Sequence, residues 1–329
     1  MEFRRLGTTD LEASAVGIGT WEIGNPGYGR TDEDEAVAAI RRGLDLGVTC
    51  FDTAPAYGFG RSEQVLGAAL GERRKDVVLV TKCGLAWRKR EGGADWWRDG
   101  SRKRVAAEID ASLRRLGTDW IDLYLLHWPD PGTPVEETAS ALADVVRAGK
   151  ARFVGVSNVG VEQVRAFDRV CPVAAVQAGY NLFDRRIEDD LLPYCRERGI
   201  AVMAYGALCY GLLAGTFSAD TRFDPADWRS TGTAFGLELF APENFPRNVA
   251  VVDALKPVAA RLGTSLPQLA LNWVVSRPGV AVGLSGVRRP SEAEDNAGAA
   301  GWRLGDGDLA EIDRIFEGAA GNDGPPVAW

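Results

Sequence analysis

Apolar runs and helical patterns alternate along almost the whole chain. Short runs rich in β-branched residues predict strands, and segments with apolar residues every three or four positions predict amphipathic helices. Strands are expected at about 15–20, 49–54, 76–82, 122–127, 151–158, 173–181, 201–208 and 280–286. Helices are expected at 31–47, 62–71, 101–117, 135–150, 161–170, 187–199 and 248–263.

Eight strand–helix units with no linker between them predict one α/β domain over residues 1–329, a (β/α)8 TIM barrel. A short hairpin is expected before the first strand, and segments 265–278 and 307–318 predict two additional helices. A doubly wound open sheet is the alternative. No G-x-G-x-x-G motif follows the first strand, which disfavours that dinucleotide-binding fold.

Two connections, at about 84–100 and 209–246, are longer than ordinary loops. Each follows a predicted strand, so each is expected over the face where barrel enzymes carry their active sites. They are rich in aromatic residues: Trp87, Trp96 and Trp97 in the first, and Tyr210, Trp228, Phe235 and Phe240 in the second.

Composition narrows the function class. The net charge of −8 argues against nucleic acid or an anionic membrane as a partner. Five cysteines with no C-x-x-C spacing, and a start without an apolar segment, predict a cytoplasmic protein. His127 is the only histidine, so a multi-histidine metal site is excluded and no metal is expected.

Polar residues stand at the carboxyl ends of the predicted strands. They are Asp52, Lys82, His127, Ser157 with Asn158, Gln177, Tyr205, and Ser285 leading to Arg288. Each alone has an ordinary explanation, such as a capping aspartate, a solvated lysine or a core histidine bonded to backbone. In a barrel, however, these strand ends converge on one face, and that convergence predicts a chemical site.

Three of these residues end consecutive predicted strands, and Tyr57 lies in the loop directly after Asp52. A carboxylate at Asp52 stabilises an ammonium at Lys82. That ammonium lowers the pKa of a nearby phenol from its usual value of about 10. A neutral His127 can bond to the same oxygen position, so the group is suited to bind and protonate a carbonyl oxygen that gains negative charge.

Such a site lacks a source of electrons. With no metal and no evident thiol nucleophile, hydride delivery from a cofactor is the expected chemistry. Ser157, Asn158 and Gln177 offer groups that match a carboxamide, and Tyr205 offers a flat face for a nicotinamide ring.

Seven segments in order resemble the aldo-keto reductase superfamily, in particular its bacterial branch with HWPDP and GxRRP patterns. They are "FDTAPAYGFGRSEQVLGAAL", "VTK", "DLYLLHWPDP", "GVSN", "VQAGYNLFDR", "AYGALCYGLLAG" and "GVRRPSEAEDNAGAA". The resemblance implies a barrel that binds NADP(H) without a Rossmann domain, and a catalytic tetrad of Asp52, Tyr57, Lys82 and His127.

The same resemblance implies the cofactor contacts. Ser157, Asn158 and Gln177 would bind the carboxamide, and Tyr205 would stack on the ring. It also implies cofactor contacts at Gly206, Leu208, Gly211 and Leu213, and, at the adenosine end, at Ser285, Gly286, Arg288, Glu292 and Asn296.

The residues at the adenosine end support both NADP and NAD as the cofactor. Glu292 stands where a glutamine or arginine often helps to bind the 2′-phosphate, and its carboxylate favours the ribose of NAD. Arg288 and Arg289 favour the phosphate of NADP. NADPH is the expected cofactor, with NADH as the alternative.

The expected partner is a small carbonyl or alcohol substrate, and oligomeric state is not predicted. Trp21, Trp87 and Trp128 are the candidates for substrate contact, together with Trp96, Trp97 and Trp329. An aromatic mouth suits a ring-bearing or apolar carbonyl, or a sugar stacked on an indole. Two other functions are the alternatives: a non-turnover subunit that senses nicotinamide, and a hydrolase using Ser157 or Cys83 with His127, which lacks an orienting third group.

Overall fold

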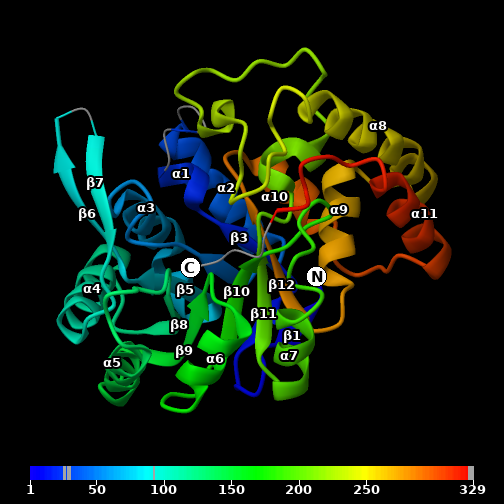
Figure 1. The fold of residues 1–329 in the computed structure, drawn as a ribbon. Coiled ribbons are helices and arrows are strands. Elements are labelled where there is room, and N and C mark those ends of the chain that lie inside the picture. The colour runs from blue at the N-terminus through cyan, green and yellow to red at the C-terminus, as the bar shows by residue number, and fades with distance from the viewer. Residues whose placement is uncertain (25–26, 28–30, 92, 325–329) are drawn as a thin grey trace.

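Eight parallel strands close into a barrel, as the alternating pattern predicts (Figure 1). The computed structural model describes residues 1–24, 27, 31–91 and 93–324. The barrel strands, in order around the sheet, are β3 (Val16–Gly19), β4 (Cys50–Asp52), β5 (Val78–Cys83), β8 (Ile121–Leu126), β9 (Ala151–Ser157), β10 (Ala175–Gly179), β11 (Ala201–Tyr205) and β12 (Val280–Gly286). β12 pairs with β3 and so closes the ring.

Helices surround the barrel and follow most of its strands directly. They are α1 (Trp21–Gly24), α2 (Glu33–Asp45), α3 (Arg61–Leu70), α4 (Arg102–Leu116), α5 (Val135–Arg147), α6 (Val161–Asp168), α7 (Leu191–Arg198), α8 (Phe245–Leu262), α9 (Leu266–Val275), α10 (Pro290–Ala297) and α11 (Asp306–Phe316). The two additional helices expected at 265–278 and 307–318 are α9 and α11. No helix in the described ranges has both the length and the apolar character that crossing a membrane requires.

The expected N-terminal hairpin forms from β1 (Phe3–Arg5) and β2 (Glu12–Ser14). Its turn inserts Leu6 and Leu11 into the apolar interior of the barrel, where both side chains are almost fully buried. Because side chains along a strand alternate between the two faces, each barrel strand supplies both this interior and the layer under the helices.

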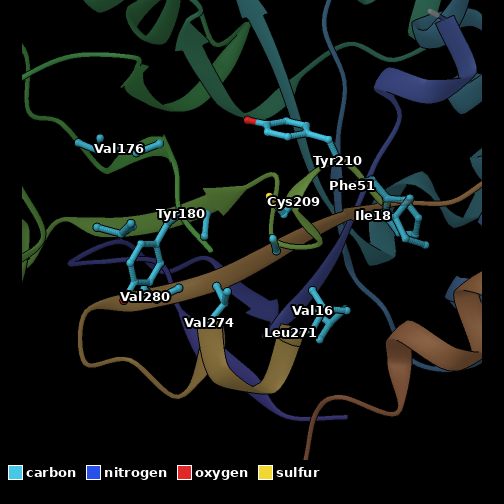
Figure 2. Close-up of a cluster of buried hydrophobic side chains, with 14 of the residues drawn as sticks. Val16, Ile18, Phe51, Val176, Tyr180, Cys209, Tyr210, Leu271, Val274 and Val280 are labelled. Carbon is cyan, nitrogen blue, oxygen red and sulfur yellow. The ribbon is translucent and has the colours of Figure 1, made fainter. Parts of the chain in front are cut away.

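The larger apolar core lies between the barrel and its helices. Figure 2 shows part of it, with Val16 and Ile18 of β3 and Phe51 of β4 pointing outward, and Leu271 and Val274 of α9 in the same cluster. All five side chains are fully or almost fully buried. The outward-facing strand residues therefore hold the helices against the barrel. The inward-facing residues fill the barrel interior and form the site.

The connection at 84–100 is not the structureless loop that the sequence suggested. It folds as an antiparallel hairpin of β6 (Leu85–Arg90) and β7 (Gly93–Arg98), which stands out from the barrel beside α3 and α4 (Figure 1). Trp87 pairs with Trp96 across it. The second long connection contains two 3-10 helices, η3 (Cys209–Ala214) and η4 (Trp228–Thr231), and is otherwise irregular.

The barrel interior offers a direct test of the packing. Leu123 on β8 is fully buried among the inward-facing residues, so Leu123→Ala should lower the free energy of unfolding by about 2–5 kcal/mol. Urea denaturation followed by circular dichroism measures this loss. Val170→Ala, at an exposed position, is the control and should change stability little. An equal effect at both positions would contradict the assignment of Leu123 to the core.

Candidate active site

A cavity of about 780 Å³ opens at the carboxyl ends of the barrel strands. Asp52, Tyr57 and His127 line it, and Lys82 lies beneath with no exposed surface. The strand period explains this placement. Asp52 is two residues after Cys50, and Lys82 two after Val80, on strand faces that point into the barrel. The sequence-predicted tetrad is therefore brought together.

Lys82 connects Asp52 to Tyr57. Its Nζ lies 2.8 and 2.7 Å from the two carboxylate oxygens of Asp52 and 2.9 Å from the carbonyl oxygen of Thr53. The Tyr57 hydroxyl is 3.3 Å from the same Nζ. Burial lowers the pKa of Lys82, and the carboxylate of Asp52 opposes that shift.

The loop that holds Tyr57 is packed against α1 through glycine. A Cβ on Gly24 would lie 2.4 Å from the backbone carbon of Tyr57, and a Cβ on Gly58 would lie 2.7 Å from the carbonyl oxygen of Gly24. Gly58 also has a φ of 63°. Only glycine fits both positions without moving the backbone, so this contact fixes the phenol over Lys82.

His127 presents a neutral imidazole to Tyr57. The two ring centroids are 5.7 Å apart in an edge-to-face arrangement. Burial, with a smaller contribution from Lys82, holds the pKa of His127 well below 6.5. Its Nδ1 is buried and has no hydrogen-bond partner among the residues that the structure describes.

Gln177 reaches the tetrad from the opposite side of the barrel. It lies on β10, four strands from β4 in the closed sheet, and its Nε2 donates to Asp52 Oδ1 at 2.7 Å. Asn158 is also held, since its Nδ2 donates to the carbonyl oxygen of His127 at 3.0 Å and its Oδ1 accepts from the Tyr205 hydroxyl at 2.8 Å. Two residues expected to hold a carboxamide are thus bonded to Asp52 and His127 of the predicted tetrad.

The cavity has polar groups suited to a nicotinamide dinucleotide. The buried hydroxyls of Ser157 and Ser285 both face it, and within the described ranges neither has a hydrogen-bond partner. Tyr205 also lines the cavity, its ring oriented by the bond to Asn158. These two serines and this aromatic face fit an amide-bearing ring and a hydroxyl-rich ligand.

Most of the other expected cofactor residues also line the cavity: Gly206, Leu208, Gly211, Gly286, Arg288, Glu292 and Asn296. Leu213 does not, because its side chain is buried in the core. Glu292 accepts a hydrogen bond from the backbone N–H of Arg288 at 2.6 Å, and the Arg288 guanidinium lies 3.6 Å from its other oxygen.

Aromatic side chains form the mouth of the cavity. Trp21, Trp96 and Trp128 line it, together with Phe235 from the long second connection. The Phe235 ring stacks on Trp128 at 6.4 Å and lies 5.5 Å from Tyr205. Trp87 does not line the cavity.

The β6–β7 hairpin supports this mouth. Trp87 packs against Phe59 and Trp96 from the side, with ring centroids 5.9 Å apart in both pairs. Trp97 is exposed, and Trp329 lies outside the described residues. In the part of the chain that the structure covers, no group of three or more His, Cys, Asp or Glu side chains is arranged to hold a metal.

Comparison with known proteins identifies the family. The sequence model of the aldo/keto reductase family matches residues 15–317. The chain belongs to the aldo/keto reductase family. Its members are oxidoreductases that use nicotinamide cofactors, as the resemblance in the sequence implied.

Three relatives show the extent of the likeness. The aldo-keto reductase YhdN of Bacillus subtilis is 40% identical, over 96% of this chain and 94% of its own. The NADH-specific methylglyoxal reductase of Escherichia coli is 35% identical, over 95% and 97%. The structure of the glycerol dehydrogenase AKR11B4 from Gluconobacter oxydans superposes with a TM-score of 0.89, at 38% identity over 99% and 98%.

Sequence reasoning missed several cavity residues of this aldo-keto reductase. Glu22 and Phe59 line the cavity, and so does Arg229. Glu22 follows a predicted strand by only a few residues, and that proximity was the one signal available. Arg229 lies in an irregular connection whose path no periodic pattern shows.

The state of His127 is directly measurable. Because it is the only histidine, the untagged protein gives a single imidazole in ¹H–¹⁵N correlation spectra. We expect that imidazole to remain neutral at pH 6, where an ordinary histidine is mostly protonated. Lys82→Met should raise the pKa of His127 only part of the way to 6.5, since burial remains. A midpoint near 6.5 in the unsubstituted protein would contradict this environment.

Proposed function

We propose that this protein reversibly reduces an aldehyde or ketone to an alcohol, with Tyr57 as the general acid and base. The observation that carries the proposal is the position of the Lys82 ammonium, 3.3 Å from the Tyr57 hydroxyl and paired with Asp52. An ammonium at that distance stabilises the phenolate that remains after Tyr57 gives up its proton.

His127 and Tyr57 share the work at the carbonyl oxygen. A neutral imidazole donates a hydrogen bond to that oxygen without competing to protonate it. Tyr57 then supplies the proton as negative charge develops. In the reverse direction, the phenolate held by Lys82 accepts the proton of the alcohol. Asp52 acts by positioning Lys82, and Gln177 acts by holding Asp52.

The cofactor would be held along the same cavity. Ser157 and Ser285 supply hydroxyls, and Tyr205 supplies a face for the ring. When bound, the nicotinamide provides the hydride that the carbonyl carbon gains in reduction. The tetrad then lies beside the reacting carbonyl, and the aromatic mouth excludes water from it.

We propose NADPH as the preferred cofactor and NADH as one that is also accepted. Two arginines, Arg288 and Arg289, follow β12, and Arg288 lines the cavity. A guanidinium binds a phosphate through strong, bidentate hydrogen bonds. Glu292 and the NADH-specific relative support the alternative.

The substrate we propose is a ring-bearing or apolar carbonyl compound. Trp21, Trp128 and Phe235 surround the entrance with flat apolar faces. These faces suit an aromatic aldehyde or a carbonyl compound with a hydrophobic ring. A sugar stacked on an indole face is the alternative that a substrate panel distinguishes.

Replacing the proposed acid tests the mechanism. Tyr57→Phe should lower kcat for an activated aldehyde such as 4-nitrobenzaldehyde by about 10²–10⁴-fold, because the proton donor is lost. Binding of NADPH, measured by quenching of protein fluorescence, should stay nearly unchanged. Tyr194→Phe, on the outer helix α7, is the matched control and should keep full activity.

Two outcomes would contradict this assignment. Full turnover by Tyr57→Phe would remove Tyr57 from its role. Tight binding of NADPH by the unsubstituted protein, without turnover of any carbonyl in a broad panel, would instead favour the nicotinamide-sensing function.

A substitution at Arg288 tests the proposed preference for NADPH over NADH. Arg288→Gln should lower kcat/KM for NADPH by about tenfold or more, the expected loss for one charge-assisted hydrogen bond, and change the value for NADH much less. Steady-state rates with both cofactors measure this, with Arg314→Gln on the surface of α11 as control. Equal or better use of NADH by the unsubstituted enzyme would overturn the preference for NADPH.

A further inference from the structure

Glu22 brings a carboxylate into the cavity at the end of β12. It lies in α1, the single helical turn after β3, and its side chain packs directly on Gly286. A Cβ on Gly286 would come within 2.0 Å of the Glu22 carboxylate carbon. Gly286 stands between Ser285 and Arg288 in the chain, so Glu22 lies among residues proposed to hold the dinucleotide.

The Glu22 carboxylate accepts a hydrogen bond from its own backbone N–H and has no hydrogen bond or ion pair with any other described residue, although its backbone oxygen accepts from the Thr31 hydroxyl at 3.0 Å. A carboxylate with a purely structural role in a half-buried place is normally bonded. One local hydrogen bond leaves most of the bonding capacity of the carboxyl group unused, and the group lines the cavity, so its position points to a ligand.

Three charged groups face Glu22 from the elements around it: Arg288 after β12, Glu292 on α10 and Arg229 on η4. Both arginines are shared with other acceptors, Arg288 with Glu292 and Arg229 with Asp227 at 2.6 Å. Burial raises the pKa of Glu22 to about 7; the hydrogen bond from its own backbone N–H and the two arginines oppose the rise, and Glu292 adds to it. Glu22 therefore changes charge near neutral pH.

Every nicotinamide dinucleotide carries a pyrophosphate with two negative charges. We propose that Glu22 controls dinucleotide affinity: its neutral form donates a hydrogen bond to the bound phosphates, and its ionised form repels them. This inference rests on the proposed function, because it requires the cavity to hold the dinucleotide. An ionised Glu22 would repel phosphates without direct contact where they lie within the screening length of about 8 Å at physiological salt.

The direction of the pH dependence of dinucleotide binding follows from the charge of Glu22. Below about pH 7 Glu22 is mostly protonated and binding is strongest, and above it the ionised form dominates. If only the neutral form binds well, the Kd for NADH should rise about tenfold between pH 6 and pH 8. Binding at pH 7 should also take up part of a proton from solution. Glu22→Gln should remove the proton uptake, flatten the pH dependence and tighten binding at pH 8.

Isothermal titration calorimetry with NADH tests this, at pH 6, 7 and 8 and in two buffers of different ionisation enthalpy. NADH is the probe because it lacks the phosphate monoester of NADPH, which itself ionises near pH 6. Glu136→Gln is the matched control: it removes one charge from the exposed start of α5, away from the cavity, and should behave like the unsubstituted protein.

The outcomes separate this inference from the proposed function. Equal pH dependence and equal proton uptake in the unsubstituted protein and Glu22→Gln would overturn the inference while leaving the reductase proposal in place. Absence of binding of both NADH and NADPH at every pH would overturn the proposed function itself. Should Glu22→Gln fold poorly, Glu22→Ala and the proton uptake of the unsubstituted protein carry the same test.

Discussion

The buried ammonium of Lys82 is the constraint on which the rest of the site depends. Removing such a charge from water costs several kcal/mol unless it is paired and hydrogen-bonded. Here Asp52 and the Thr53 carbonyl accept its bonds, and Gln177 donates in turn to Asp52. The Tyr57 hydroxyl also lies beside this ammonium, and Tyr57 lines the cavity.

Barrel closure joins the catalytic and cofactor ends into one network. Gln177 crosses from β10 to Asp52 on β4, and Asn158 links the His127 backbone to Tyr205. A ligand amide that bonds to Asn158 or Gln177 therefore acts on groups already tied to the tetrad. Under the proposed function, Asn158 and Gln177 would contact the cofactor and also hold the residues around Lys82, because opposite strands meet in a narrow interior.

The fold and the meeting of Asp52, Lys82 and His127 could be predicted because both follow from local periodicity, whereas Tyr57 was predicted from its place in the loop after Asp52 and from the family resemblance. Asp52, Lys82 and His127 end strands whose alternation is clear, so their inward orientation follows from the sequence. The bond from Gln177 to Asp52 could not be foreseen, because it depends on register around the whole sheet. The place of Glu22 in the cavity could not be predicted either, because Glu22 lies in a single helical turn that shows no periodicity. The β6–β7 hairpin was not predicted because the adjacent Trp96 and Trp97 interrupt the alternation of apolar and polar residues.

Two carboxylates in this cavity illustrate how surroundings decide the role of one chemical group. Asp52 is paired with the Lys82 ammonium and accepts a hydrogen bond from Gln177, so its charge is compensated. Glu22 lacks such a partner among the described residues, and its charge remains sensitive to pH. Under the proposal for Glu22, its charge would affect turnover at low cofactor concentration and not at saturating cofactor. Rates measured at both concentrations would therefore separate cofactor affinity from the later steps of the reaction.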